Sequence, residues 1–258
     1  MYVIELKQVT KTYNNGLQAL KPTKLSISAG SFTVILGPSG AGKSTLLQII
    51  NGLESTTSGE VIVLGQKLTP QNMSRLRAKA AMVFQQFNLV GRLNVMTNVL
   101  IGRLHHNPWW MSLLYLFKKQ DKTIARWALA RVNLTTKAWE RADCLSGGQQ
   151  QRVGIARALA QQPKIILADE PVASLDPVTS EEILTLLQKI CREDGIAVVA
   201  SLHQVDLAMN FADRIIGLNS GKVVFDGSPK ELGSDAIRKI YLREDGNIDE
   251  HIQLGMVN

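Results

Sequence analysis

The chain has 258 residues, of which 45% are hydrophobic and 20% are charged, and its formal net charge is +7 at pH 7. This length suits one large α/β domain or two smaller ones, and the composition excludes disordered and fibrous proteins. The positive charge fits a nucleic-acid partner, acidic lipid or plain solubility, and it decides nothing by itself.

Neither a membrane span nor a metal-binding cysteine pattern is visible in the sequence. The longest apolar stretches, such as residues 109–117, fall far short of the ~20 residues that cross a bilayer. Residues 1–10 lack the basic flank and apolar core of a secretion signal, so we expect a cytoplasmic protein. Cys144 and Cys191 have no CxxC spacing, which indicates neither a disulfide framework nor a zinc site.

Residues 1–53 predict β structure followed by a strand, a loop and a helix. Alternating polar and apolar residues over 1–29 indicate short strands with one solvated face, so a small antiparallel β region opens the predicted fold. Residues 31–36 are typical of a buried strand, 37–42 of a glycine-rich turn, and 43–53 of a helix.

The rest of the chain predicts a mainly parallel sheet covered by helices, with more helices inserted in its middle. Further strands are predicted at 60–64, 81–85, 165–169, 197–202 and 215–218. Strands that alternate with helical stretches favour an α/β fold, and 181–191 carries an apolar stripe with helical spacing. Strand signals vanish between 87 and 162, which predicts an inserted helical subdomain. The tail at 244–258 is predicted to be loosely ordered.

A phosphate-binding pattern lies between the strand at 31–36 and the helix that follows it. The pattern GxxxxGK[ST], the P-loop, is formed by Gly37, Pro38, Ser39, Gly40, Ala41, Gly42, Lys43 and Ser44. Glycines let successive backbone N–H groups turn toward phosphate oxygens, and the helix N-terminus adds partial positive charge. We expect Lys43 to bridge the β- and γ-phosphates, Ser44 to bind Mg²⁺ and Thr45 to steady the α-phosphate. Alone, the pattern predicts nucleotide binding of the kind that kinases, GTPases and motors share.

Two carboxylates, Asp169 and Glu170, end the apolar run that begins at Ile165. The carboxyl end of a buried strand is where α/β sheets bind ligands. We expect Asp169 to hold Mg²⁺ through water, and Glu170 to accept a proton from the attacking water. A strand that ends in two acids is common by itself, so these roles depend on the P-loop elsewhere in the chain.

The most specific pattern is the LSGGQ segment formed by Leu145, Ser146, Gly147, Gly148 and Gln149. Here the chain resembles the ABC ATPase family, whose signature is LSGGQ, over nearly its whole length. The resemblance implies one ABC-type nucleotide-binding domain over residues 1–258, with the signature inside the helical subdomain at 87–162. It also implies that Ser146 and Gly148 of one copy close over the γ-phosphate held by a second copy, in a head-to-tail dimer. A Ser-Gly-Gly turn at a helix start is itself a ready anion site.

Four further residues take their roles from this resemblance. It implies that Tyr13 stacks on adenine, that Gln85 of the Q-loop senses Mg²⁺, and that Asp176 and His203 belong to the D-loop and the H-loop. Lys43, Gln85, Glu170 and His203 are thus the expected catalytic set, with ATP and Mg²⁺ as cofactors. Taken singly, Tyr13, Gln85 and His203 are equally typical of packing or surface residues. Asp176 precedes Pro177 and is also typical of a helix N-cap.

The resemblance favours transport over a stand-alone mechanical role. The chain has one motif set and no sustained heptads, unlike coiled-coil DNA-repair ATPases and translation factors with two such domains. The implied partners are transmembrane permease subunits and, through them, an extracytoplasmic substrate-binding protein, with no nucleic acid. We therefore expect a peripheral protein at the cytoplasmic face of the cell membrane.

The branch that the chain resembles most is phosphonate import. The resemblance rests on NPWWMSLLYLFKKQD within 102–121, RAD at 141–143, EPVASLD at 170–176 and SLHQVDL at 201–207. Amino-acid and phosphate importers stay open, as do exporters of the lipoprotein-release or macrolide type, which share FQQFNL and LSGGQQQR. The aromatic and basic insertion is typical of an amphipathic packing helix, or of a contact with the membrane subunit or the lipid surface.

Overall fold

The structure is a computed structural model that describes residues 1–108 and 117–242. The chain divides into two compact units: unit 1 comprises Met1–Leu68 and Val199–Asn258, and unit 2 comprises Thr69–Val198. Within the described ranges, no helix is long and apolar enough to cross a lipid bilayer. The predicted tail at 244–258 and the centre of the aromatic insertion at 109–116 lie outside the described residues.

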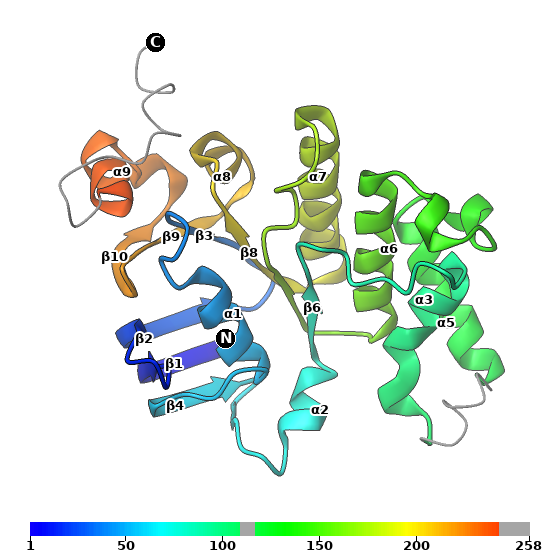
Figure 1. Ribbon diagram of the computed structural model, residues 1–258, viewed down its shortest axis with the longest axis horizontal. Coiled ribbons are helices and arrows are strands. Elements are labelled where there is room, and N and C mark those ends of the chain that lie inside the picture. The colour runs from blue at the N-terminus through cyan, green and yellow to red at the C-terminus, as the bar shows by residue number, and fades with distance from the viewer. Residues whose placement is uncertain (109–116, 243–258) are drawn as a thin grey trace. The chain divides into compact units, whose positions relative to one another are not determined.

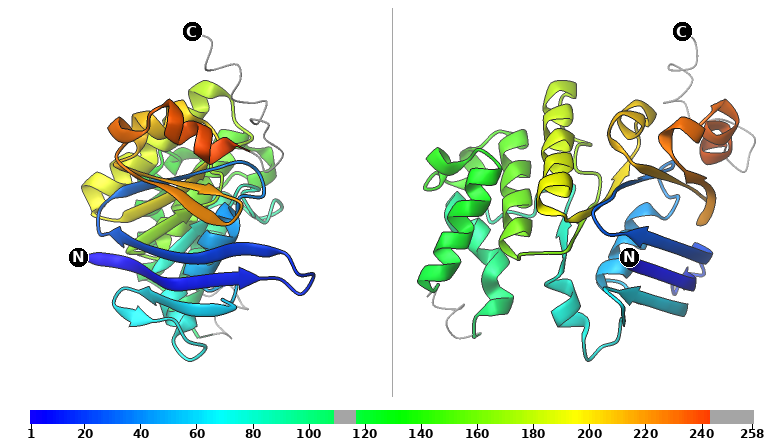
Figure 2. Two further views of the ribbon diagram at one scale, coloured as in Figure 1. Left: turned by 90° about the vertical axis from the view of Figure 1, so that its left-hand side faces the viewer. Right: turned by 180° about the vertical axis from the view of Figure 1, so that it is seen from behind.

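An antiparallel sheet opens unit 1. Its strands are β1 (Tyr2–Thr12), β2 (Gln18–Ser28), β4 (Ser58–Val63) and β5 (Gln66–Lys67), in the order β2-β1-β4-β5. Figure 2 shows the blue to cyan ribbons of β1, β2 and β4 side by side. Leu6 and Ile27 are buried, whereas their neighbours along the strand are partly or fully exposed, as in a sheet with one solvated face. The predicted antiparallel region is confirmed.

The strands β1 and β2 are longer than predicted, with 11 residues each. Register shifts interrupt their pairing between Leu6 and Val9, and again between Val9 and Lys11. A bulge of this kind adds a residue and resets the side-chain alternation. The sequence pattern therefore indicated several short strands where the structure has two continuous ones.

A second strand set in unit 1 carries the P-loop. The order is β10-β9-β3-β8, with β3 (Phe32–Leu36) buried at every residue and parallel to β9 (Arg214–Asn219). Strand β8 (Ala197–Leu202) begins in unit 2 and ends in unit 1. The edge strand β10 (Lys222–Gly227) runs antiparallel to β9. The helical segments of unit 1 are α1 (Lys43–Asn51), α8 (Val205–Phe211), η4 (Pro229–Glu231) and α9 (Ser234–Tyr241).

One predicted strand belongs to the other sheet, and one strand of the structure was missed. The segment predicted at 60–64 is β4, which pairs antiparallel with β1 instead of joining the parallel sheet. Pairing partners are distant in sequence, so local alternation does not reveal them. Strand β10 was not predicted, because no residue of this edge strand is fully buried and no clean alternation results.

Unit 2 combines two parallel strands with a group of helices. Strand β6 (Ala80–Val83) pairs parallel with β7 (Ile165–Ala168), and every residue of both is buried. The helical segments are α2 (Met73–Arg77), α3 (Val95–Leu100), η1 (Ile101–His106), α5 (Lys119–Arg131), η2 (Thr135–Lys137), η3 (Ala142–Cys144), α6 (Gly147–Ala160) and α7 (Pro177–Asp194). Figure 1 shows α3, α5 and α6 packed together in green. The predicted helix at 181–191 is confirmed as part of α7, which starts about one turn earlier.

The predicted helical insertion at 87–162 lies wholly within unit 2. Its described residues contain no strand, and only an isolated bridge joins Asn94 to Arg141. Unit 2 also contains β6, β7 and α7, so the compact unit is larger than the predicted insertion. A separate subdomain with these bounds stays a prediction.

Candidate functional site

The glycine-rich turn of the P-loop connects β3 to α1 in unit 1, as the pattern predicts. Gly40 and Gly42 have φ angles of 80° and 101°, in the left-handed region that favours glycine. A Cβ atom on Gly42 would also collide with the carbonyl oxygen of Ala19 in β2. Ser39 and Gly40 are exposed, so the turn presents its backbone to solvent next to the N-terminus of α1. This is the geometry in which backbone N–H groups bind an anion.

The side chain of Lys43 folds back into this turn. Lys43 is the first residue of α1 and only 4% exposed, and its Nζ donates to the carbonyl oxygens of Gly37 at 2.8 Å and Pro38 at 3.0 Å. The same Nζ lies 3.4 Å from Nδ1 of His203. An ammonium has no lone pair, so this contact needs Nδ1 as acceptor and places the imidazole proton on Nε2. Unit 1 thus brings together the predicted phosphate ligand and the predicted H-loop histidine.

His203 follows β8 directly and is half-buried. The hydroxyl of Tyr241 in α9 donates to the backbone carbonyl of His203 at 2.8 Å. Helix α9 therefore holds the backbone that carries the imidazole. No local pattern indicates a role for Tyr241, because its contact joins positions 38 residues apart.

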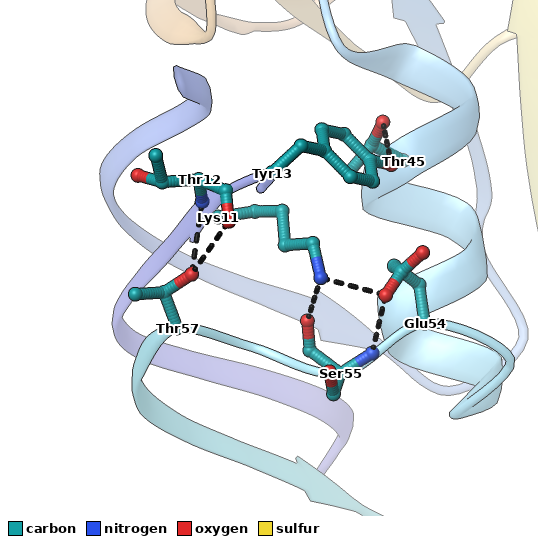
Figure 3. Close-up of polar contacts among 7 residues, drawn as sticks. All are labelled: Lys11, Thr12, Tyr13, Thr45, Glu54, Ser55 and Thr57. Carbon is teal, nitrogen blue, oxygen red and sulfur yellow. Dashed lines mark hydrogen bonds and ion pairs between the residues drawn. The ribbon is translucent and has the colours of Figure 1, made fainter. Parts of the chain in front are cut away.

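The predicted adenine contact, Tyr13, lies in the turn after β1 and is half-buried. Its hydroxyl lies 3.3 Å from Oγ1 of Thr45, in the first turn of α1. The Nζ of Lys11 lies 4.9 Å from the centre of the Tyr13 ring (Figure 3). The aromatic side chain is therefore held beside the helix that follows the P-loop, as a base-stacking role requires.

In unit 2, Gln85 and Asp169 lie at the carboxyl ends of two neighbouring parallel strands. Val83 of β6 is in register with Ala168 of β7, and the backbone N–H of Asp169 donates to the carbonyl of Val83 at 2.9 Å. Gln85 comes two residues after Val83, whereas the strand had been predicted to continue through it. The shorter strand leaves Gln85 exposed in a loop. The structure therefore brings both predicted magnesium ligands of this unit to one sheet edge.

Glu170, the predicted general base, has an unusual backbone conformation. Its φ angle is 46°, a region that non-glycine residues seldom occupy, and it precedes Pro171, which restricts its backbone further. The backbone N–H of Ala173 donates to the carbonyl of Glu170 at 3.3 Å, which closes a turn after the residue. Strained backbone of this kind is found preferentially at active sites and switch regions.

The loop after Gln85 is fixed to the helix that follows the signature. Phe87 and Asn88 have φ angles of 54° and 49°, and Arg157 of α6 donates to their carbonyl oxygens at 2.9 Å and 2.5 Å respectively. Burial lowers the pKa of Arg157 from its ordinary value. This arginine connects the predicted Q-loop to α6 within unit 2. Arg157 is not among the predicted site residues, and its local sequence shows only an isolated charge in an otherwise apolar stretch of helix.

The signature segment forms the N-terminus of α6. Ser146 is the N-cap, with the backbone N–H of Gln149 donating to its Oγ at 3.4 Å and its own N–H donating to Oε1 of Gln149 at 3.2 Å. Ser146 and Gly147 are exposed, and a Cβ atom on Gly148 would collide with the side chain of Thr179. A hollow of about 310 Å³ lies beside this turn. An exposed helix start of this kind can accept an anion.

Asp176 is the N-cap of α7. Its Oδ1 accepts a hydrogen bond from the backbone N–H of Thr179 at 3.0 Å, and Pro177 occupies the first turn. Hydrogen bonding from Thr179 lowers the pKa of the Asp176 carboxyl. The N-cap prediction is thus confirmed, whereas the D-loop role stays a prediction.

Residues 20–173 match the family model for the ABC transporter. The chain belongs to the ABC transporter family. A phosphonates import ATP-binding protein from Trichodesmium erythraeum is 62% identical over 260 residues, covering 100% of both chains. A protein of the same description from Thiobacillus denitrificans is 61% identical, covering 99% of both chains. The family confirms that this chain is an ABC-type ATP-binding subunit with ATPase activity.

Solved structures of ATP-binding cassettes have the same fold. A dimeric cassette in a post-hydrolysis state bound to ADP and phosphate has a TM-score of 0.74 at 39% identity, covering 88% of this chain and 98% of that one. A subunit of an ABC transporter complex from Clostridium perfringens has a TM-score of 0.81 at 30% identity, covering 95% and 96%. The predicted α/β fold of the ABC type is confirmed.

Proposed function

We propose that this chain is the ATP-hydrolysing subunit of a membrane importer for phosphonates or related phosphorus compounds. The observation that carries the proposal is the full-length similarity to proteins described as phosphonates import ATP-binding proteins, at 62% and 61% identity. The matched length covers 100% and 99% of this chain and therefore includes the P-loop, the signature and the segments between them. A transporter's substrate is chosen mainly by its other subunits, so the residues of this chain do not specify it. The substrate proposed here therefore follows the description of the relatives.

Nucleotide binding begins at the P-loop. In our proposal the Lys43 ammonium leaves the carbonyl oxygens of Gly37 and Pro38 and bridges the β- and γ-phosphates, while the N–H groups of the turn bind the same oxygens. Thr45 steadies the α-phosphate and Tyr13 stacks on the adenine. The close approach of Tyr13 to Thr45, at 3.3 Å, supports a base site next to the phosphate site.

Magnesium fits the donors that the chain offers. The Ser44 hydroxyl, the Gln85 amide oxygen and the Asp169 carboxylate are hard oxygen ligands, the type that Mg²⁺ prefers, and Mg²⁺ usually takes only one or two carboxylates beside phosphate and water. When bound, Mg²⁺ would neutralise negative charge on the β- and γ-phosphate oxygens.

For hydrolysis we propose that Glu170 accepts a proton from the attacking water. The water oxygen forms a bond to the γ-phosphorus as the bond to the bridging oxygen of ADP breaks. His203, with its proton on Nε2, donates to the γ-phosphate and stabilises the charge that develops there. The strained backbone at Glu170 supports a carboxylate held in a fixed position before the reaction.

Catalysis further requires a second copy of the chain. We propose that Ser146, Gly147, Gly148 and Gln149 of one copy close over the γ-phosphate bound by the other, so that ATP joins a head-to-tail dimer. The exposed N-terminus of α6 supports this role, and so does the dimeric cassette to which the fold is similar. Hydrolysis removes the bridging γ-phosphate and weakens the dimer. Asp176 contributes to the same interface in this proposal.

The remaining partners are membrane proteins. We propose that the loop after Gln85 and the helices at 87–162 contact transmembrane permease subunits, which receive substrate from an extracytoplasmic binding protein. The chain would then lie peripherally on the cytoplasmic face of the membrane. The link from Arg157 to Phe87 and Asn88 supports a relay between this loop and the signature helix.

The test is ATP turnover by the complex reconstituted in lipid vesicles with its permease and binding protein. Methylphosphonate or ethylphosphonate with the binding protein should stimulate turnover several-fold, and Glu170→Gln should remove the stimulated rate. Glu181→Gln, an exposed carboxylate in α7, is the matched control and should leave it unchanged. A response to amino acids or inorganic phosphate alone would reassign the substrate, and turnover independent of any binding protein would favour an exporter.

A further inference from the structure

Lys11 is a buried lysine at the end of β1, two residues before Tyr13. Only 10% of its side chain is exposed, although lysine is among the residues that are seldom buried. Its Nζ donates to Oε1 of Glu54 at 2.6 Å and to the carbonyl oxygen of Ser55 at 2.9 Å. Both acceptors lie in the turn that follows α1, the helix of the P-loop (Figure 3). Hydrogen bonding from Lys11 also lowers the pKa of Glu54, so the carboxyl is ionised at neutral pH.

The ammonium group makes a third contact, with the ring of Tyr13. Its Nζ lies 4.9 Å from the ring centre, within the ≈ 6 Å range of cation–π attraction. An ammonium has three N–H donors, and the two hydrogen bonds to Glu54 and Ser55 leave one for this contact. Glu54 and Ser55 thus hold the charge in place, and the charge holds the aromatic ring.

The ion pair is not needed to attach β1 to the turn after α1. Other hydrogen bonds already join β1 to Thr57 and Ser58: Thr57 N–H to the Thr10 carbonyl at 2.9 Å, Thr12 N–H to the Thr57 Oγ1 at 2.9 Å, the Thr57 hydroxyl to the Thr12 carbonyl at 3.3 Å, and the Thr10 and Ser58 hydroxyls at 2.7 Å. The buried ammonium therefore adds a contact with Tyr13 that these other hydrogen bonds do not make. A salt bridge that served only as a tether would not need a cation against an aromatic ring.

We propose that Lys11 is a positioning residue that fixes the Tyr13 ring for stacking on the purine base of the nucleotide. The inference rests on the proposed function, since it requires Tyr13 to contact the base. The ring is held at its hydroxyl by Thr45 and at its centre by Lys11. A ring already fixed in one orientation loses less rotamer entropy when a base stacks on it. Lys11 itself does not touch the nucleotide, and its effect passes through Tyr13.

The test compares Mg·ADP with Mg·pyrophosphate by calorimetry, because the two ligands share a diphosphate and only ADP has a base. The preference for ADP over pyrophosphate measures the contacts of the adenosine, and the part of this preference that Tyr13→Ala removes measures the base contact. Lys11→Met keeps an unbranched side chain but removes the charge, and should lower this preference about fivefold, a typical scale for a partly buried cation–π contact. Lys11→Arg should restore it, because a guanidinium also stacks on aromatic rings. Lys7→Met, an exposed lysine of the same strand, is the matched control and should change nothing.

A double-mutant cycle separates positioning from general stability. Tyr13→Ala should lower the preference for ADP, and adding Lys11→Met to it should have no further effect on the preference. The exchange of Lys11→Glu with Glu54→Lys restores an ion pair but places a carboxylate near the ring, so the preference should stay low. Full recovery by this exchange, or an equal loss for both ligands in Lys11→Met, would overturn the proposal.

The controls also separate this proposal from the proposed function. If wild-type protein binds pyrophosphate but has no preference for ADP, or if Tyr13→Ala leaves the preference intact, the base contact and the role of Lys11 both fail while the phosphate site stands. If wild-type protein binds neither ligand, the proposed function itself fails. Thermal unfolding of each variant checks that the fold is intact before binding is compared.

Discussion

The ion pair between Arg103 and Asp121 gives the sharpest prediction about the stability of unit 2. Both side chains are only 5% exposed, and Nε of Arg103 lies 2.9 Å from Oδ1 of Asp121. Arg103 also donates to the Ala160 carbonyl at 2.8 Å and to Oε1 of Gln162 at 3.1 Å, while Asn107 donates to Oδ2 of Asp121 at 2.8 Å. The pair therefore joins η1, the start of α5 and the end of α6.

Arg103→Met removes the charge but keeps most of the stem. Among the described residues, it leaves the buried carboxylate with the Asn107 amide as a side-chain partner, and it takes a donor from the Ala160 carbonyl. Breaking a buried pair in this way costs about 3–5 kcal/mol. For a chain of this size that corresponds to a fall in Tm of roughly 10 °C. Circular dichroism during heating measures it, and Arg126→Met on the exposed side of α5 is the matched control.

The pH dependence of Tm tests whether the unpaired Asp121 carboxylate causes the loss of stability in Arg103→Met. Burial raises the pKa of Asp121, but hydrogen bonds from Asn107 and Arg103 outweigh it and hold the pKa below the ordinary 3.8. A lowered pKa means that the pair stabilises the fold above pH 3.8, and that this stability is lost as the pH falls through the folded-state pKa. The difference in Tm between wild type and Arg103→Met should therefore be largest at pH 7 and should shrink as the pH falls toward and below 3.8.

A double variant tests whether the unpaired charge, and not the loss of the arginine side chain, lowers the stability. Replacing both partners, as Arg103→Met with Asp121→Leu, removes the unpaired charge and should recover most of the lost stability. A single variant that loses less than about 1 kcal/mol, or a double variant no better than the single one, would show that the buried charge is not what costs stability.

The remaining predictions concern the site itself. Glu170→Gln should keep ATP affinity but slow hydrolysis by about 10²–10⁴-fold and trap a dimer visible by size-exclusion chromatography; a normal rate means that Glu170 is not the base. Lys43→Ala should abolish tight ATP binding measured by calorimetry, with Lys24→Ala as the exposed control; unchanged affinity rules out the phosphate role. Lys11 lowers the pKa of Glu54, so their ion pair stabilises the fold above pH 4.5. This stabilisation is lost as the pH falls through the folded-state pKa of Glu54. The Tm gap between wild type and Glu54→Gln should narrow over that range, and a gap that widens contradicts this sign.

Several parts of the site were readable from local sequence because their chemistry is local. The P-loop glycines, Lys43 and Ser44 are consecutive, and the left-handed φ angles of Gly40 and Gly42 follow from the residue type. The signature begins a helix because Ser146 and Gln149 form a capping box at fixed spacing. Asp176 before Pro177 predicted an N-cap for the same reason, and the structure has it.

Other parts depended on contacts between distant segments. The strand predicted at 60–64 joined the antiparallel sheet because β1 was its neighbour in space. Arg157 meets the carbonyl oxygens of Phe87 and Asn88 some 70 residues away, and Tyr241 meets that of His203. The entropic cost of closing a loop depends only weakly on the length of the loop, so many distant residues are similarly accessible as partners. No local sequence pattern therefore specifies such pairs.

The sequence by itself determined the phosphate-binding turn, the two acids after a buried strand, the signature helix start and the α/β order of elements. Each of these is set by residue type and spacing within a few positions of the chain. Only the tertiary structure decided that Lys43 meets His203, that Arg157 fixes the loop after Gln85, and that Lys11 lies against Tyr13. Side chains with several rotatable bonds have many possible partners in sequence, and packing selects the one they contact.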